Sequence, residues 1–199
     1  TLPLLQLTHA RRLGTGLFGM VYGGYLESMF AGFGGELLHR PMNSDWALGV
    51  DLNWVKQRDF DQDFGLRNYD TVTGHLTGYY RGLDDVLDKL SVGRYLAGDY
   101  GATLDLSREF HNGVRFGAWA TLTDASDEEF GEGSFDKGIY VSIPFDELMT
   151  TSTLRRAELA FAPLTRDGGA RLERAYGLFG LTEGRHTKLF QSNHHKLTE

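Results

Sequence analysis

The stretch that decides the fold is Trp46-Ala47-Leu48-Gly49-Val50-Asp51-Leu52-Asn53-Trp54. Its even-numbered residues are large and apolar, and its odd-numbered residues are small or polar. Because alternate side chains of a β-strand point to opposite faces, this segment has one apolar face with a tryptophan at each end and one wet face. A strand that crosses a bilayer has this pattern, with apolar side chains toward lipid, aromatic residues at both interfaces and small or polar residues toward an aqueous interior.

The same alternation recurs from Phe18 onward in a series of predicted strands. Turn signals separate these strands at intervals of roughly ten to fifteen residues, which is typical of an antiparallel meander. Asn112-Gly113, near the middle of the series, predicts a tight hairpin. The predicted strands span residues 19–25, 30–39, 46–58, 71–81, 89–95, 100–110, 114–123, 137–145 and 154–162. The predicted fold class is therefore all-β, an antiparallel meander that forms an outer-membrane β-barrel or the C-terminal part of one.

Composition restricts the class of protein. The chain has 199 residues, with 26 glycines, 13 Phe, 9 Tyr, 3 Trp and no cysteine. This length suits one domain, and glycine together with aromatic residues favours β structure. The absence of cysteine excludes disulfides, thiol nucleophiles and thiolate zinc sites. The net charge of -7, with lysines and arginines scattered singly or in pairs, argues against nucleic acid as a partner. No run approaches ~18 apolar residues, so no transmembrane helix is predicted.

The two ends of the chain are less regular than its middle. We divide the sequence into a lead-in over residues 1–17 that joins upstream sequence, a β-barrel domain over residues 18–182 and a polar tail over residues 183–199. The lead-in and the tail are expected to be poorly ordered or engaged with further sequence.

An acidic stretch after the strand at 46–58 resembles a calcium-binding loop. Asp59, Asp61, Asp63 and Asp70 occupy positions 1, 3, 5 and 12 of such a loop. Phe64 stands where the loop needs glycine, and an aspartate replaces the bidentate glutamate of position 12. The favoured interpretation is a solvated acidic loop at the end of a strand.

A second acidic run could in principle supply an acid/base pair that acts on a sugar. It comprises Asp127, Glu128, Glu129, Glu132 and Asp136. Neighbouring carboxylates in a glycine-rich loop need not converge, and nothing identifies a buried partner with a raised pKa. The seven histidines show no HExxH spacing, and no GxSxG element or P-loop is present. We therefore predict no catalytic residue, no cofactor, no metal site and no enzymatic activity.

The polar face of the predicted strands carries hydroxyls, a few charges and aromatic rings. Aromatic rings stack on sugar faces, and hydroxyls exchange hydrogen bonds at low cost, so such a face suits a hydrated channel or a sliding sugar chain. The equally weighted alternative is that these residues merely fill and cross-link a barrel interior. Arginine at Val50, on the apolar face, is expected to be more harmful than arginine at Thr103, on the polar face. The candidate lumen or glycan contacts are Tyr79, Arg94, Arg115 and Trp119.

With these residues in view, the chain resembles the YjbH/YmcA (group 4 capsule) family of bacterial exopolysaccharide proteins. The resemblance covers most of residues 18–172, in order. The matching blocks are GMVYGGYLESMFAGFGGELLHRP, WALGVDLNWVKQRDFDQDFG, YDTVTGHLTGYY, LSVGRYLAGDYGATLDLSREF, NGVRFGAWATLTD, EEFGEGSFDKGIYVSIPF and PLTRDGGARL.

The resemblance implies an outer-membrane β-barrel protein of Gram-negative bacteria, encoded with exopolysaccharide or capsule genes, that helps polysaccharide leave the cell. The implied partners are the lipid bilayer of the cell outer membrane, polysaccharide and other exopolysaccharide export proteins in the periplasm. The family supplies no catalytic residue and has no established enzymatic activity. Its members are several times longer than this chain, so these residues are expected to be a C-terminal portion.

Two other hypotheses remain open from the residues alone. A soluble β-sandwich or lipocalin-like barrel that binds a saccharide or an apolar ligand would turn the apolar face inward and the polar face to water. A carboxylate-based glycan hydrolase or lyase would depend on the second acidic run. Against these stands the favoured prediction, a conduit or scaffold for exopolysaccharide in the outer membrane.

Overall fold

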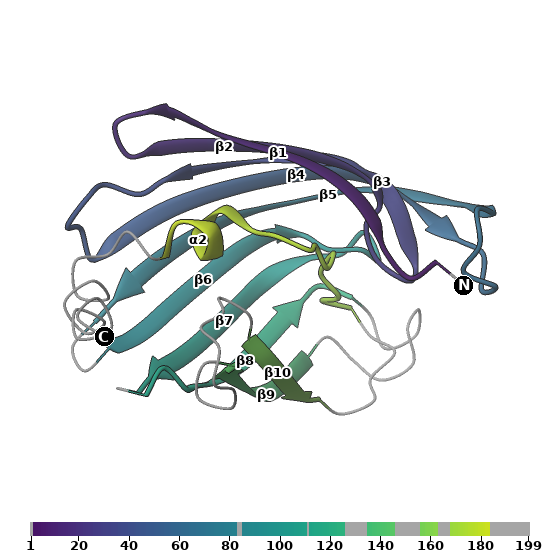
Figure 1. Cartoon of the computed structure of the whole chain (residues 1–199). Helices are drawn as coiled ribbons and strands as arrows, with labels where there is room; N and C mark the ends of the chain where they lie inside the picture. The colour runs from purple at the N-terminus through teal and green to yellow at the C-terminus, as the bar shows by residue number, and fades with distance from the viewer. Residues whose placement is uncertain are drawn as a thin grey trace.

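The computed structural model describes residues 2–82, 85–110, 112–125, 135–145, 156–162 and 168–183. Its strands form one antiparallel sheet, and their order in the sheet is their order in the chain (Figure 1). They are β1 (Leu5–Gly14), β2 (Leu17–Tyr25), β3 (Phe30–His39), β4 (Trp46–Arg58), β5 (Leu66–Arg81), β6 (Val86–Arg94), β7 (Tyr100–Glu109), β8 (Arg115–Thr123), β9 (Phe135–Pro144) and β10 (Arg156–Phe161). The predicted all-β antiparallel meander is confirmed.

β1 corrects the prediction of an irregular lead-in over residues 1–17. This strand pairs with β2 in antiparallel register from Leu5, opposite Tyr25, to Gly14. Arg11 and Arg12 interrupt the apolar alternation near its end, which explains why the sequence does not show it clearly. The signal that could have revealed it is the turn, where Gly16 adopts a left-handed backbone conformation with φ of 72°.

The orientation of the two sheet faces is the one predicted for a membrane strand. In β4, Leu52 and Trp54 are 64% and 39% exposed, whereas Asp51 and Asn53 are 9% and 2% exposed. A soluble sandwich or lipocalin-like barrel requires the opposite orientation, because soluble monomers rarely expose large apolar patches. Among the described residues this apolar face stays uncovered, which favours the membrane hypothesis over that alternative. Along the sheet, the exposed apolar residues include Val21, Phe33, Leu37, Trp46, Val50, Val72, Leu76, Leu90, Val92, Leu104, Phe116, Leu122 and Ile139.

The sheet curves into a trough (Figure 1), and the buried polar side chains of its strands lie on the concave side. β1 and β10 stand at its two ends, and no pairing joins them among the described residues. The ten described strands do not close into a barrel. No helix within the described ranges has the length and apolar character needed to cross a membrane.

One segment that was not predicted crosses the concave side of the sheet. Residues 168–183 lie there and include the short helix α2 (Leu178–Leu181) (Figure 1). Leu178 is 2% exposed, and it joins a buried apolar cluster with side chains of the first strands. The other members of this cluster are Phe18, Met20, Tyr22, Leu26, Leu38, Ala47, Val55 and Leu96. Residues 184–199 of the predicted tail lie outside the described residues.

Candidate functional site

Glu36 on β3 is the first anchor of segment 168–183. Glu36 is 5% exposed, and its carboxylate faces the concave side. Arg174 donates from Nη1 to Glu36 Oε2 and to Tyr22 Oη, both at 2.9 Å. The backbone N–H of Leu178 donates to the same carboxylate at 3.2 Å. One buried carboxylate therefore neutralises an arginine and caps the start of α2.

Asp51 on β4 is a second buried carboxylate beneath this segment. It accepts a hydrogen bond of 2.9 Å from Asn53 Nδ2, and His75 Nδ1 lies 3.7 Å from its Oδ2. Arg171 Nη2 lies 3.9 Å from Asp51 Oδ1, and Arg171 Nη1 donates to Ser91 Oγ at 2.9 Å. The segment thus contributes positive charge above an acidic part of the polar face.

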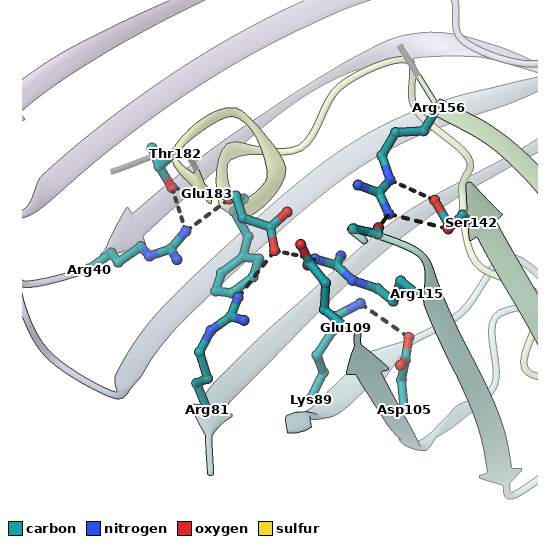
Figure 2. Close-up of polar contacts among 12 residues, drawn as sticks. Arg40, Arg81, Lys89, Asp105, Glu109, Arg115, Ser142, Arg156, Thr182 and Glu183 are labelled. Carbon is teal, nitrogen blue, oxygen red and sulfur yellow. Dashed lines mark hydrogen bonds and ion pairs between the residues drawn. The ribbon is translucent and has the colours of Figure 1, made fainter. Parts of the chain in front are cut away.

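Glu183 forms a third anchor. Here the segment supplies the carboxylate and the strands supply the arginines. Arg81 Nη2 lies 3.2 Å from Glu183 Oε1, and Arg115 forms an ion pair with the same oxygen (Figure 2). Arg115 also pairs with Glu109 at 2.5 Å. Burial alone would raise the pKa of Glu183, but the neighbouring arginines, Arg115 foremost, outweigh burial and lower it. Glu183 is therefore held as a carboxylate that joins β5 to β8.

Arg40 fixes the end of α2 between these anchors. Its guanidinium donates to the carbonyl oxygen of Phe179 at 3.0 Å and to Thr182 Oγ1 at 3.1 Å (Figure 2). It also lies 4.3 Å from the centre of the Phe179 ring, and the Tyr79 ring stacks on Phe179 at a centroid distance of 4.1 Å. The chain thus covers the polar face over β2 to β5 with a segment of its own.

Beyond this covered region, a cavity of about 890 Å³ opens between the C-terminal half of the sheet and residues 173–183. This volume lies in the range of small-molecule sites. Its lining mixes aromatic rings with charges of both signs. The sheet side comprises Lys89, Asp105, Arg115, Trp119, Tyr140, Ser142, Phe145, Arg156, Glu158 and Ala160, and the segment side comprises Glu173, Ala175, Tyr176, Gly177, Gly180, Leu181 and Glu183.

The structure brings together two of the four candidate contacts. Arg115 and Trp119 both line the cavity. Tyr79 lies on the polar face as predicted, but the Phe179 ring covers it. Arg94 has the same parity as the exposed Leu90 and Val92, and it lies 5.9 Å from the Tyr100 ring on the apolar face. Its placement on the polar face was wrong, because β6 keeps its alternation to its last residue.

Two acidic stretches were the other candidates for chemistry. In the loop at 59–65, the carbonyls of Gln62 and Asp63 accept hydrogen bonds from Arg58 at 3.0 and 3.2 Å. Within the described ranges, no group of three acidic, histidine or cysteine side chains could hold a metal ion. Four carboxylates of the second acidic run, Asp127 to Glu132, lie outside the described residues.

Sequence reasoning missed the contribution of segment 168–183 and of Tyr140 and Arg156 to the cavity. The segment has no strand alternation, and its arginines find their carboxylate partners more than a hundred residues earlier in the chain. The one available signal was the alternation of Tyr140 with Ile139 and Val141 in the predicted strand at 137–145, which places Tyr140 on the polar face.

Comparison with known proteins identifies the family. The family described as "Exopolysaccharide biosynthesis protein YbjH" matches residues 1–184. The "Uncharacterized lipoprotein YjbH" of Escherichia coli (strain K12) is 48% identical over 186 residues, which are 91% of this chain and 27% of that protein. The chain thus spans about a quarter of the length of this relative. No solved structure matches the chain. The chain belongs to the YjbH family of exopolysaccharide biosynthesis proteins, as the resemblance indicated.

Proposed function

We propose that this chain is part of an outer-membrane β-structure that assists exopolysaccharide production and export as a conduit or scaffold. The apolar convex face contacts lipid, and the polar concave face borders the path or docking site of the polysaccharide. The protein acts without a catalytic step of its own. Other exopolysaccharide export proteins in the periplasm would deliver or receive the polymer.

The observation that carries this proposal is the exposed apolar face. It continues over neighbouring strands, and in β4 it is bounded by Trp46 and Trp54, at 51% and 39% exposure. Aromatic residues at both ends of an apolar band are typical of strands that cross a bilayer, where indole rings lie at the two interfaces. In water, an apolar surface of this extent would promote association.

The family and the named relative support the setting. The family is described by exopolysaccharide biosynthesis, and the relative from Escherichia coli is called a lipoprotein. A lipid anchor on a protein of this kind favours a membrane location. We extend this location to the outer membrane because bacterial proteins that cross a bilayer with antiparallel strands are of the outer-membrane type.

The experiment that tests this proposal is heat-modifiability of the full-length protein in purified outer membranes. A folded membrane barrel resists detergent, so the unboiled sample is expected to migrate faster than the boiled sample in a gel. Recovery of the protein in the soluble periplasmic fraction, with identical mobility in both samples, would contradict the proposal. A transmembrane result would justify conductance measurements with the polysaccharide.

A further inference from the structure

Two aromatic rings in the cavity lie flat against the sheet because each covers a glycine on the neighbouring strand. Trp119 on β8 is the register partner of Gly138 on β9, and Tyr140 on β9 is the partner of Gly117 on β8. A Cβ on Gly138 would lie 2.1 Å from the Trp119 ring, and a Cβ on Gly117 would lie 2.3 Å from the Tyr140 ring. Glycine at these two positions therefore makes room for the rings.

This arrangement turns one face of each ring toward the cavity. Both rings line it, and their centroids are 6.2 Å apart with 37° between the ring planes. One face of each ring packs on glycine backbone, so the opposite face is open to the cavity. Two adjacent ring faces of this kind form a platform that a flat, partly apolar molecule can cover.

Hydrogen-bonding groups surround this platform. Tyr140 Oη donates to Asp105 Oδ1 at 3.0 Å, and Lys89 Nζ lies 3.2 Å from Asp105 Oδ2. On the other side, Arg156 Nε donates to Ser142 Oγ at 2.8 Å (Figure 2). Hydroxyl, carboxylate and amine groups beside an aromatic face match the alternation of C–H faces and hydroxyls on a sugar ring.

The opposite wall of the cavity leaves space above the platform. It is formed in part by Ala175, Gly177 and Gly180. A Cβ at Gly180 would meet no atom within 4 Å. The cavity is therefore not filled by the segment that covers it.

The charges near the platform favour an uncharged ligand. Lys89 is paired with Asp105, and Arg115 is paired with Glu109 and Glu183. These two cations are neutralised. Arg156, which donates to Ser142 and to the carbonyl of Gly113, adds one cation to the lining, and Glu158 and Glu173 add two acidic groups. An anionic group such as phosphate or sulfate would meet this acidic lining without a cluster of unpaired cations to offset it.

We propose that Trp119 and Tyr140 form a stacking subsite for an uncharged sugar unit of a polysaccharide chain. The inference rests on the proposed function, since it names where the polymer makes contact. Ring faces bind the C–H face of the sugar, and the flanking polar groups bind its hydroxyls.

The test measures binding to the full-length protein in detergent by titration calorimetry. The probe is the mixture of neutral oligosaccharides released by partial acid hydrolysis from the exopolysaccharide of the bacterium that encodes the protein. Wild type is expected to bind, and Trp119→Ala is expected to weaken binding about tenfold or more, with Trp119→Phe between the two. Gly180→Trp is expected to place a ring in the space opposite the platform and to weaken binding.

Gly78→Trp is the matched control, because a Cβ at Gly78 also meets no atom within 4 Å, and Gly78 has the parity of the exposed Leu76 and Tyr80 on the apolar face. It is expected to bind as wild type does. No binding by folded wild type, or unchanged binding by both Trp119→Ala and Gly180→Trp, overturns the subsite. Gel mobility of the same preparations separates the two proposals: a heat-modifiable protein that binds no oligosaccharide leaves the membrane placement intact, and a soluble protein that binds through Trp119 leaves the subsite intact.

Discussion

At the scale of single residues, Val50 tests whether the apolar face meets lipid. Its side chain is 46% exposed in the middle of β4. In a bilayer, Val50→Arg is expected to cost ~2–4 kcal/mol of folding free energy, because a charge near the midplane must leave water. The measurement is guanidinium unfolding of the full-length protein from lipid vesicles.

Val50→Met is the control, since it lengthens the same side chain without a charge. It is expected to change the free energy of unfolding by no more than about 0.5 kcal/mol. If the apolar face were in water, both variants would change the free energy of unfolding by no more than about 0.5 kcal/mol.

Arginine at Thr103 would not serve as a mild comparison, contrary to the sequence-based expectation. Thr103 is 6% exposed and hydrogen-bonded to Tyr95 at 2.6 Å and to Thr121 at 2.9 Å.

Glu27, in the turn between β2 and β3, makes stability depend on pH. Burial raises its pKa to about 7, although the N–H of Glu173, which donates to its carboxylate, acts in the opposite direction. In the unfolded chain the pKa is near 4.5. Between these values the folded protein holds a proton that the unfolded chain has lost, so the contribution of Glu27 to stability falls as pH rises from about 4.5 to 7.

Glu27→Gln is therefore expected to unfold at the same denaturant concentration as wild type near pH 4.5 and at a higher concentration at pH 8. Glutamine keeps an oxygen that can accept the Glu173 N–H, so the comparison isolates the charge. The pKa of Glu183 is lowered in the folded protein, so its contribution to stability is lost as pH falls. This contribution is the same in wild type and Glu27→Gln. An equal difference between the two proteins at both pH values would contradict the assignment.

At the scale of elements, the docking of segment 168–183 depends on Arg174. Removing this arginine leaves Glu36 buried without its cation, and the side chain of Arg174 is itself only 17% exposed. We expect Arg174→Gln to cost about 3 kcal/mol, the lower end of the range for breaking a buried ion pair. The measurable result is faster chymotryptic cleavage after Tyr176 and Phe179.

The control for this cleavage is Arg67→Gln, because Arg67 is an exposed arginine whose ring contact is Phe60, at 4.4 Å. Its cleavage rate within 168–183 is expected to equal that of wild type. Equal rates for Arg174→Gln and wild type would mean that the Glu36 ion pair does not hold the segment.

The sequence predicts the elements whose defining interactions lie between residues close together in the chain, and it misses those that depend on distant residues. β3 and β4 have the predicted bounds, because strand alternation is a local property of the sequence. β1 and segment 168–183 lack clean alternation, and their positions depend on contacts with distant residues. Arg58 shows the same limit. It is 0% exposed, and it donates to the carbonyl oxygens of Leu2 and Asp63, which are contacts that no local sequence pattern reveals.

The candidate site was predictable to the same extent. Alternation placed Arg115 and Trp119 on the polar face, and both line the cavity. The cover over Tyr79 could not be foreseen, because Phe179 reaches it from a segment a hundred residues later. Arg94 was assigned to the polar face, although the alternation of β6 continues to this last residue and places it on the apolar face.

At the scale of the whole molecule, the two ends of the sheet set a condition on the membrane proposal. β1 and β10 each have one edge without a neighbouring strand among the described residues. In hydrocarbon, each unpaired N–H or C=O costs several kcal/mol, so open edges do not persist there. Either β1 pairs with β10, or further strands outside the described residues lie between them. The separation of the two edges in the described sheet favours the second arrangement (Figure 1).

Cysteine pairs can distinguish these arrangements, because the chain has no cysteine of its own. Leu159→Cys on β10 would be combined in turn with Leu5→Cys, Leu7→Cys and Leu13→Cys on β1, all on exposed apolar side chains. In the full-length protein in membranes, oxidation is expected to join none of these pairs, because intervening strands hold the Cα atoms more than about 7 Å apart. Leu159→Cys with Val141→Cys is the positive control, since these residues are partners across β9 and β10. A disulfide between β1 and β10 would instead show that ten strands close the ring, and the polar face would then enclose a lumen narrowed by segment 168–183.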